Sequence, residues 1–224
     1  MPKRPLITER DLRRAEAEGH RTLVIAPNTL VTALARDYAR DHGITLTERT
    51  VAPEPASKPA APARPEAPPR TLALGCDHAG FAIKAALAEH ARSLGWTITD
   101  VGTDSDARCD YPDFAYAVAR LVALGEVRFG LMIDGVGVGS AMVATKVPTV
   151  RAACCASEFA AFNARAHNDA NVLTLGSRTS GIEVCKRILS TFLDTKFEGG
   201  RHAERVQKIV DVEARFLPGS PDAL

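Results

Sequence analysis

The sequence lacks any long apolar run, and its charges almost cancel. No run approaches the ~18–20 apolar residues of a membrane-spanning helix, so we expect no membrane partner. Lys and Arg number 28 against 27 Asp and Glu, which leaves a net charge of +1. Such a balance does not indicate a basic surface for binding a nucleic acid or an anionic membrane. Residues 1–21 carry basic side chains but no apolar core behind them, so we expect no secretory signal.

Cysteine is scarce, and its pattern excludes a disulfide or zinc framework. The number is odd and no C-x-x-C occurs, which favours reduced thiols in a cytoplasmic protein. The five cysteines are Cys76, Cys109, Cys154, Cys155 and Cys185. The 224 residues, 46% of them apolar and 25% charged, suffice for one good-sized domain and a small appendage.

Proline is concentrated in one segment, residues 52–70. Seven of the 14 prolines lie in these 19 residues, which contain no large apolar side chain. Proline fixes φ and removes amide donors, so we expect a stiff spacer that holds its ends up to roughly 60 Å apart. The spacer separates a small N-terminal module, residues 1–51, from a larger domain, residues 71–217.

The N-terminal module has the pattern of a small α/β unit. One helix is predicted between a Thr8 cap and Gly19, and a second between a Thr32 cap and Gly43. "RTLVIAP" and "ITLTE" are predicted strands. The two helices have narrow apolar faces, so the module by itself would be only marginally stable. We therefore expect it to pack against another surface or to dock to a partner.

Beyond the spacer, five apolar strands alternate with helices. The predicted strands are 71–77, 96–102, 129–134, 150–156 and 170–176, and helices follow each of them, with a last helix at 201–216. This alternation predicts a Rossmann-like α/β/α sandwich with a five-stranded parallel sheet. In such sheets ligands bind beyond the carboxyl ends of the strands.

Polar side chains and a glycine loop follow several of these strands. We expect them to collect at one edge of the sheet. They are Asp77 and His78 after the first strand, Asp134 with Gly135, Gly137 and Gly139 after the third, His167, Asn168 and Asp169 after the fourth, Arg178 after the fifth, and Arg201 and Arg205 on the last helix.

Each feature also has a structural interpretation. The glycine loop could be a tight turn into a helix, and its spacing fits neither the P-loop nor the dinucleotide fingerprint. Asp134 could be the N-cap of the following helix. Arg201 and Arg205, four residues apart, could be a solvated basic face or a bidentate clamp for an anion.

Five stretches of the second domain closely resemble the ribose-5-phosphate isomerase B family, which includes the galactose-6-phosphate and allose-6-phosphate isomerases. The similarity runs from about Thr71 to Val210, with the motifs in the family's order and spacing. The stretches are "LALGCDHAGFAIK", "DYPDFA", "GVGVGSAMVATKVPTVRAA", "HNDANVLTLGSR" and "FEGGRHAERV".

The resemblance implies an aldose–ketose isomerase of a phosphorylated sugar, with no metal or organic cofactor. It implies a site formed between two subunits, and hence a homodimer or a tetramer. By position, Asp77 and His78 contact the sugar, and His167 is the acid or base that opens the furanose ring, while Asn168 holds a hydroxyl. The enediolate is held by Gly135, Val136, Gly137, Val138 and Gly139, and the phosphate by Arg178, Arg201 and Arg205.

Asp134 departs from the family's pattern. Members usually carry a cysteine base there and a threonine at the position of Val136, and some relatives carry a glutamate base at the position of Ser140. We hypothesise that Asp134 is the general base, since a carboxylate can perform this proton transfer. Ribose 5-phosphate and ribulose 5-phosphate are the favoured substrates. The alternatives are a tetrose 4-phosphate or hexose 6-phosphate, or a binding protein that has lost the chemistry.

The N-terminal stretch from Pro5 to Ile44 resembles the leading segments of proteins from bacterial microcompartment operons, such as the ethanolamine-utilisation cupin-type protein. The resemblance implies that residues 1–51 dock the chain to shell or to other cargo. The protein would then lie inside a microcompartment and not free in the cytoplasm. The alternative is a small accessory domain that only stabilises the dimer.

Overall fold

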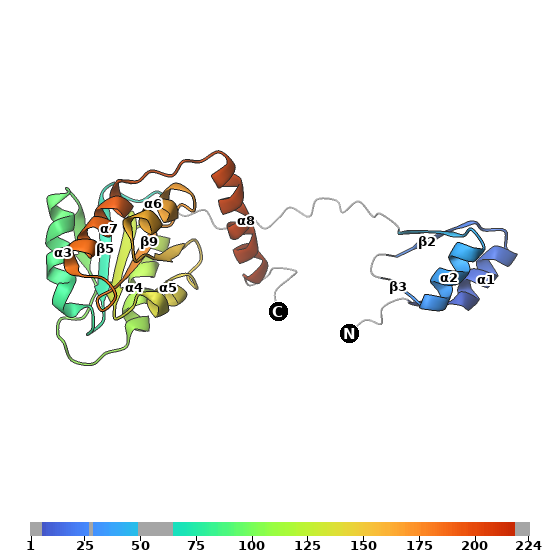
Figure 1. The fold of residues 1–224 in the computed structure, drawn as a ribbon, viewed down its shortest axis with the longest axis horizontal. Helices are drawn as coiled ribbons and strands as arrows, with labels where there is room; N and C mark the ends of the chain where they lie inside the picture. Colours follow the sequence, from blue (N-terminus) through green and yellow to red (C-terminus); the bar gives the residue numbers. More distant parts are fainter. Residues whose placement is uncertain (1–5, 27–28, 49–64, 218–224) are drawn as a thin grey trace. The chain divides into compact units, whose positions relative to one another are not determined.

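The computed structural model describes residues 6–26, 29–48 and 65–217. The chain divides into two compact units, Met1–Lys58 and Pro59–Leu224 (Figure 1). Most of the predicted spacer, residues 49–64, lies outside the described residues.

The N-terminal unit is a small α/β module, and its two predicted helices are confirmed. Its elements are β1 (Leu6–Ile7), α1 (Glu9–Ala17), β2 (Thr22–Ile25), β3 (Leu30–Val31), α2 (Ala33–Asp41) and β4 (Thr45–Glu48). Strands β2 and β4, which were predicted, pair in parallel, and so do β1 and β3. Strands β1 and β3 were not predicted, because two residues are too few to show an alternating pattern.

Capping residues start both helices of this unit. The Asp11 carboxylate accepts hydrogen bonds from the backbone N–H (2.9 Å) and the hydroxyl (2.7 Å) of Thr8. The Thr32 hydroxyl accepts from the N–H of Ala35 at 3.2 Å. The core beneath the helices is small, as expected for so short a segment. Its buried members are Leu12, Ala35, Ala39 and Ile44.

The second unit confirms the predicted five-stranded parallel sheet, in the order β6-β5-β7-β9-β8. The central strands β5, β7 and β9 are almost completely buried, which explains their continuous apolar sequences. The strands are β5 (Thr71–Cys76), β6 (Thr97–Asp100), β7 (Phe129–Asp134), β8 (Ala152–Cys154) and β9 (Val172–Gly176).

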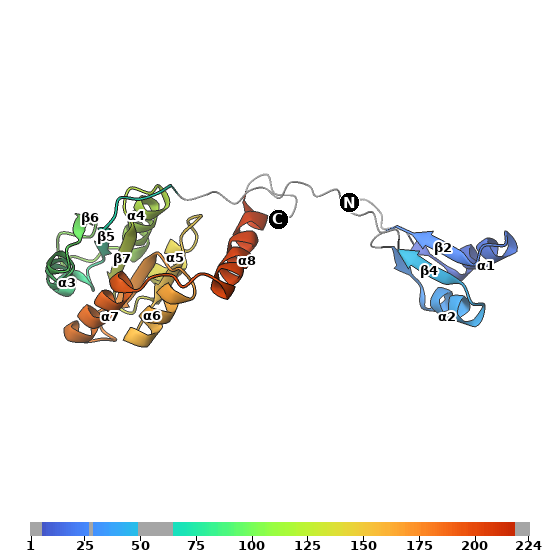
Figure 2. The same ribbon diagram turned by 90° about the horizontal axis from the view of Figure 1, so that it is seen from above.

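Helices cover both faces of the sheet (Figure 2). On one face a core cluster joins Leu87, Ala161 and Ile188, which belong to α3, α6 and α7. On the other face Val118 of α4 and Ala144 of α5 share a second cluster. The bounds are α3 (Phe81–Ser93), α4 (Tyr111–Ala123), α5 (Val138–Ala144), α6 (Glu158–Ala166), α7 (Ile182–Asp194) and α8 (Arg201–Phe216). Among the described residues no helix is long and apolar enough to cross a membrane.

Helix α8 projects from the side of the sandwich (Figure 1). Its apolar side chains Ile209, Val212 and Phe216 are about half exposed. They line a groove of about 710 Å³ whose opposite wall includes residues of the segment 145–153. The groove is mainly apolar, and no described residue fills it.

Candidate active site

Three strand ends meet at the carboxyl edge of the sheet, as predicted. The N–H of Asp77, just after β5, donates to the carbonyl of Ile133 in β7 at 3.2 Å. The N–H of Ser177, after β9, donates to the carbonyl of Asp134 at 2.8 Å. The N–H of the next residue, Arg178, donates to the carbonyl of Gly135 at 3.1 Å. The ends of β5, β7 and β9 therefore form one continuous rim.

Asp77 and His78 stand at the start of α3. The buried carboxylate of Asp77 accepts hydrogen bonds from the N–H groups of Ala79 (2.9 Å) and Gly80 (3.1 Å), so it caps the turn into the helix. The ring of His78 is partly exposed, with Nδ1 3.1 Å from the carbonyl oxygen of Cys109. A donor at Nδ1 fits that contact and leaves Nε2 for a ligand.

The buried Asp134 carboxylate is turned into the loop that follows it. Its Oδ1 accepts from the N–H groups of Val136, at 2.7 Å, and Gly137. Its Oδ2 accepts from the hydroxyl of Ser140. The carboxylate therefore stands beside backbone amides because it satisfies some of them itself. The N-cap of α5 is Gly137, which has no side-chain cap, so Asp134 braces the loop before the helix and is not the helix N-cap.

These hydrogen bonds reduce the number of backbone N–H groups that can bind the enediolate. Two of the five residues expected to hold the enediolate, Val136 and Gly137, already donate their N–H groups to Asp134. The N–H groups of Val138 and Gly139 lie in the first turn of α5, where amides have no partner within the helix. The N–H groups of Val138 and Gly139 therefore remain as donors for a ligand oxyanion.

His167 and Asn168 lie at the other end of the sheet, and the prediction that they share an edge with Asp134 was wrong. Helix α6 runs antiparallel to the strands and returns the chain to their amino ends. The turn after it leads into the first residue of β9, while Asp134 pairs with Gly176 at the last. At ~3.3 Å per residue, the length of β9 separates the two places by about 15 Å.

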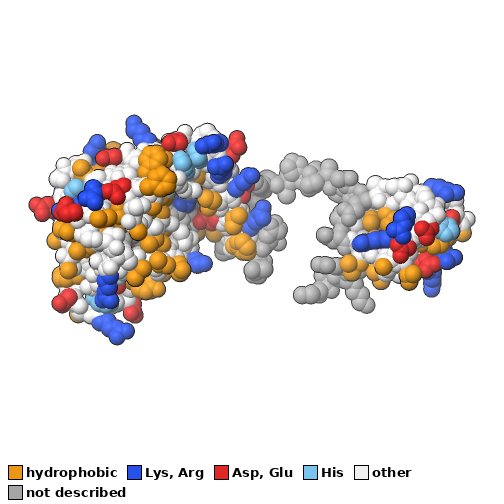
Figure 3. Space-filling model, in the orientation of Figure 1, with side chains coloured by type: hydrophobic (Ala, Val, Ile, Leu, Met, Phe, Trp, Pro, Cys, Tyr) orange, Lys and Arg blue, Asp and Glu red, His pale blue; other side chains and the backbone are white. Residues whose placement is uncertain are grey.

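Arg201 and Arg205 belong to the same amino-edge group. Helix α7 also returns the chain to this edge, and the N–H of Glu198 donates to the carbonyl of Ala166 at 3.0 Å. Helix α8 then opens with the two exposed arginines. Figure 3 shows basic side chains over the start of α8, with histidine beside them. Among the described residues, no hydrogen bond, ion pair or ring contact joins this group to the carboxyl-edge group.

An ion-pair network holds the turn that carries His167 and Asn168. Asp169 adopts a left-handed backbone conformation with φ 47°. Its carboxylate accepts from Arg151 at 2.7 Å and from the buried Arg165 at 2.8 Å. Arg151 Nε also donates to the carbonyl of Asn168 at 3.2 Å. Both arginines therefore fix the backbone of the turn.

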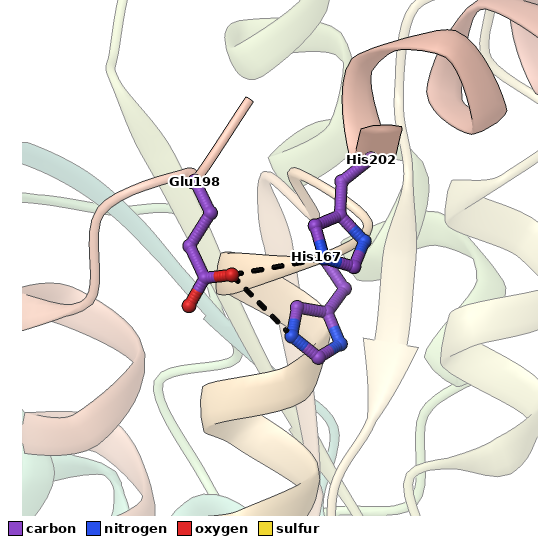
Figure 4. A group of neighbouring side chains, drawn as sticks. All are labelled: His167, Glu198 and His202. Carbon is purple, nitrogen blue, oxygen red and sulfur yellow. Dashed lines mark ion pairs between the residues drawn. The ribbon is translucent and has the colours of Figure 1, made fainter. Parts of the chain in front are cut away.

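His167 lies within a group that the sequence analysis did not single out (Figure 4). Its ring stacks on that of His202, with centroids 4.0 Å apart and planes 1° apart. Glu198 Oε2 lies 3.6 Å from Nε2 of His167 and 3.7 Å from Nε2 of His202. Glu198 lies directly before Gly199 and Gly200, both at positive φ, which turn the chain into α8.

Burial and nearby cations act on His202. Desolvation is the largest cause that lowers its pKa, followed by the positive charges of His167 and Arg201, while Glu198 acts in the opposite direction. Arg201 Nε lies 3.4 Å from His202 Nε2 and donates to it. His202 is therefore a neutral imidazole whose Nε2 accepts.

The two histidines and Glu198 carry atom types that can bind a metal ion. Their donor atoms all lie within 4.8 Å of one another. The lone pairs of imidazole nitrogens lie in the ring planes, and two parallel planes cannot both contain one ion. A tetrahedral zinc site would require one ring to rotate. The arrangement therefore fits an ion pair next to a stacked ring better than a metal site.

The similarity to known proteins lies in the second unit. The family model described as Ribose/Galactose Isomerase matches residues 72–209. Ribose-5-phosphate isomerase B of Escherichia coli is 43% identical over 146 residues, 65% of this chain and 98% of the relative. The structure of Clostridium thermocellum ribose-5-phosphate isomerase B matches with a TM-score of 0.65 and 40% identity, over 66% of this chain and 99% of that one. The chain belongs to the ribose/galactose isomerase family.

The family also contains relatives with other named substrates. The D-erythrulose-4-phosphate isomerase of Pectobacterium atrosepticum is 37% identical over 140 residues, 62% of this chain and 92% of the relative. The comparisons confirm the predicted enzyme class, a sugar phosphate isomerase of the ribose-5-phosphate isomerase B type. The family match begins at residue 72, so the N-terminal unit lies outside it.

In this ribose/galactose isomerase, the predicted site residues fall into two groups. The carboxyl-edge group contains Asp77, His78, Asp134, the glycine loop and Arg178. The amino-edge group contains His167, Asn168, Arg201 and Arg205, with Glu198 and His202 in addition. A sugar phosphate that touches both groups would need two copies of the chain.

Proposed function

We propose that the protein interconverts ribose 5-phosphate and ribulose 5-phosphate through an enediolate, with Asp134 as the base. The carboxylate at the end of β7 carries this proposal. It is buried at the rim where ligands of parallel sheets bind, and its Oδ2 accepts from a single side chain, Ser140. One lone pair of Oδ2 is thus free to take a proton.

The reaction moves one proton between neighbouring carbons. Asp134 takes the proton from C2 of the open-chain aldose and returns it to C1. The hydroxyl proton of O2 moves to O1, so O2 becomes the carbonyl oxygen and O1 the hydroxyl. Charge develops on the oxygens, where the N–H groups of Val138 and Gly139 can stabilise it. The hydrogen bonds from Val136, Gly137 and Ser140 hold the carboxylate in one orientation, as a positioned base requires.

The same proposal includes a homodimer with shared sites. The carboxyl-edge group of one subunit would supply Asp134, and the amino-edge group of the other would supply His167 and the arginines that bind the phosphate. The separation of the two groups by the length of β9 supports this arrangement. So does the apolar groove beside α8, which a second copy of the chain could fill.

A tetrose 4-phosphate is the second candidate substrate. The 37% identity to a D-erythrulose-4-phosphate isomerase favours it. Val136 is exposed on the loop, where the resemblance implies threonine, so a hydroxyl that could bind a longer sugar is missing. A protein without turnover is the third candidate, because the carboxylate of Asp134 already has three donors.

The test is turnover of the purified full chain on ribose 5-phosphate, a tetrose 4-phosphate and a hexose 6-phosphate side by side. We expect the highest kcat/KM for ribose 5-phosphate. A higher value for the tetrose 4-phosphate would establish the second candidate. Binding of all three without turnover would contradict the proposed isomerase.

Subunit mixing tests the shared site. Asp134→Asn and Arg205→Ala each remove one group, and the two variants are co-expressed. In a mixed dimer with shared sites, one site carries both changes and the other carries none, so activity returns. If each chain holds a complete site, the mixture stays as inactive as its parents.

For the N-terminal unit, we propose docking to the shell or other cargo of a bacterial microcompartment. A separate small core and the exposed side chains of Leu6, Val24, Leu30 and Leu34 support a docking role. A fluorescent reporter fused to residues 1–70 should concentrate in shells. A diffuse reporter would favour the accessory-domain alternative.

A further inference from the structure

His167 uses its two ring nitrogens differently. Nδ1 lies 2.8 Å from the side-chain amide of Asn163, one helical turn earlier on α6. An amide can donate to a bare Nδ1 or, turned over, accept from Nδ1–H, so Asn163 fits both protonation states of the ring. Proton exchange with a ligand therefore takes place at Nε2.

Nε2 of His167 faces a carboxylate. Glu198 Oε2 lies 3.6 Å away, an ion-pair distance longer than a hydrogen bond. The side chain of Glu198 is 51% exposed, so solvent weakens this pair but leaves it accessible to a bound sugar. Glu198 thus places a carboxylate beside the nitrogen that exchanges protons.

His202 supplies a flat, uncharged surface for the same ring. It is buried, and its Nε2 accepts from Arg201, so its neutral form is favoured. Stacking at 4.0 Å fixes the plane of the His167 ring.

We propose that Glu198 and His202 are positioning residues that orient the ring of His167 for opening the furanose ring. This inference rests on the proposed isomerase function. Protonated His167 gives its Nε2 proton to the furanose oxygen O4 as the C1–O4 bond breaks. Nε2 then takes the proton of the C1 hydroxyl as C1 becomes a carbonyl. One proton moves from O1 to O4, and no oxidant or reductant is needed.

Two reactions with the same phosphate separate ring opening from proton transfer. Ribose 5-phosphate is mainly a furanose and needs ring opening. Ribulose 5-phosphate has its O5 blocked by the phosphate, so it cannot close a five-membered ring and stays open-chain. Exchange of its C1 hydrogen with deuterium from the solvent, followed by NMR, reports proton transfer alone.

Glu198→Gln in the full chain is the decisive variant. We expect kcat on ribose 5-phosphate to fall about tenfold, less than the ~100-fold or more that a general acid contributes. Deuterium exchange of ribulose 5-phosphate should stay at the wild-type rate.

Glu204→Gln is the matched control. Glu204 is exposed in the first turn of α8 and makes no ion pair with either histidine among the described residues. Its loss removes a similar charge near the arginines. We expect the ratio of ribose 5-phosphate turnover to ribulose 5-phosphate exchange to remain unchanged, since phosphate affinity affects both reactions equally.

Other outcomes overturn the inference. Equal loss of both reactions in Glu198→Gln would show a structural role, and wild-type behaviour in both would show no role. Neither reaction in the wild-type protein would overturn the proposed function together with the inference. His202→Phe keeps a flat ring and should keep ribose 5-phosphate turnover, whereas His202→Ala should slow ribose 5-phosphate turnover alone. A loss of exchange in His202→Ala would contradict the positioning role.

Discussion

The carboxylate of Asp134 accepts the hydroxyl hydrogen of Ser140, six residues further along the chain. This bond ties the end of β7 to α5 and closes the glycine loop between them. The N–H groups of Val136 and Gly137 donate to the other oxygen of the same carboxylate. Asp134 thus has a structural role in the loop whether or not it also moves a proton.

Gly137→Ala should disrupt this loop. Gly137 has φ +88°, and a Cβ there would lie 2.9 Å from the Sγ of Cys154 and 3.1 Å from the backbone of Leu175. We expect a loss of about 1–3 kcal/mol of unfolding free energy, measured by denaturant titration, together with lost turnover. The matched control is Gly181→Ala, because a Cβ at Gly181 meets no atom within 4 Å. Equal stability of the two variants would contradict the close packing of the loop.

Asp169→Asn should loosen the turn that carries His167. Asparagine tolerates the left-handed backbone of Asp169, so the change isolates the charge that pairs with Arg151 and Arg165. Breaking a buried pair costs ~3–5 kcal/mol, and Asp169 is about one third exposed, so we expect about 1–3 kcal/mol. Thermal unfolding and KM for ribose 5-phosphate are the measurements. A variant with wild-type stability and KM would show that the network does not order the turn.

The five thiols should differ sharply in reactivity. Burial raises the pKa of Cys76 to about 11 and that of Cys155 to about 12, so neither forms appreciable thiolate near pH 8. Burial also raises the pKa of Cys185. Cys154 is exposed and Cys109 is partly exposed. A maleimide at pH 8, followed by mass spectrometry, should label Cys154 and Cys109 in the folded protein, and the other three only after unfolding. Rapid labelling of Cys76 without unfolding would contradict its burial.

The strand ends were predictable from the sequence because buried parallel strands are continuous apolar runs. Asp77 and Asp134 stand where such runs stop, so their common edge followed from the fold class. The position of His167 depended on the direction of α6, which returns the chain to the amino ends of the strands. The residue pattern around His167 does not show that direction.

The contacts of Glu198 and His202 were not predictable for a different reason. Glu198 meets His167 across 31 residues of sequence, through a turn whose path depends on Gly199 and Gly200. No local pattern encodes such a distant contact. The sequence allowed two roles for Asp134, a cap or a base, and did not decide between them.

The most direct test of the central claim is kcat on ribose 5-phosphate for Asp134→Asn, with the dissociation constant for the sugar phosphate measured by calorimetry. Asparagine keeps an oxygen to accept from Val136 and Gly137, so the loop should stay folded, and Asp134→Cys restores the residue that the resemblance implies. The account predicts that Asp134→Asn loses at least ~100-fold in kcat with binding nearly unchanged, and that Asp134→Cys retains turnover. Unchanged kcat in Asp134→Asn would contradict a carboxylate base and leave Asp134 as the cap of its loop.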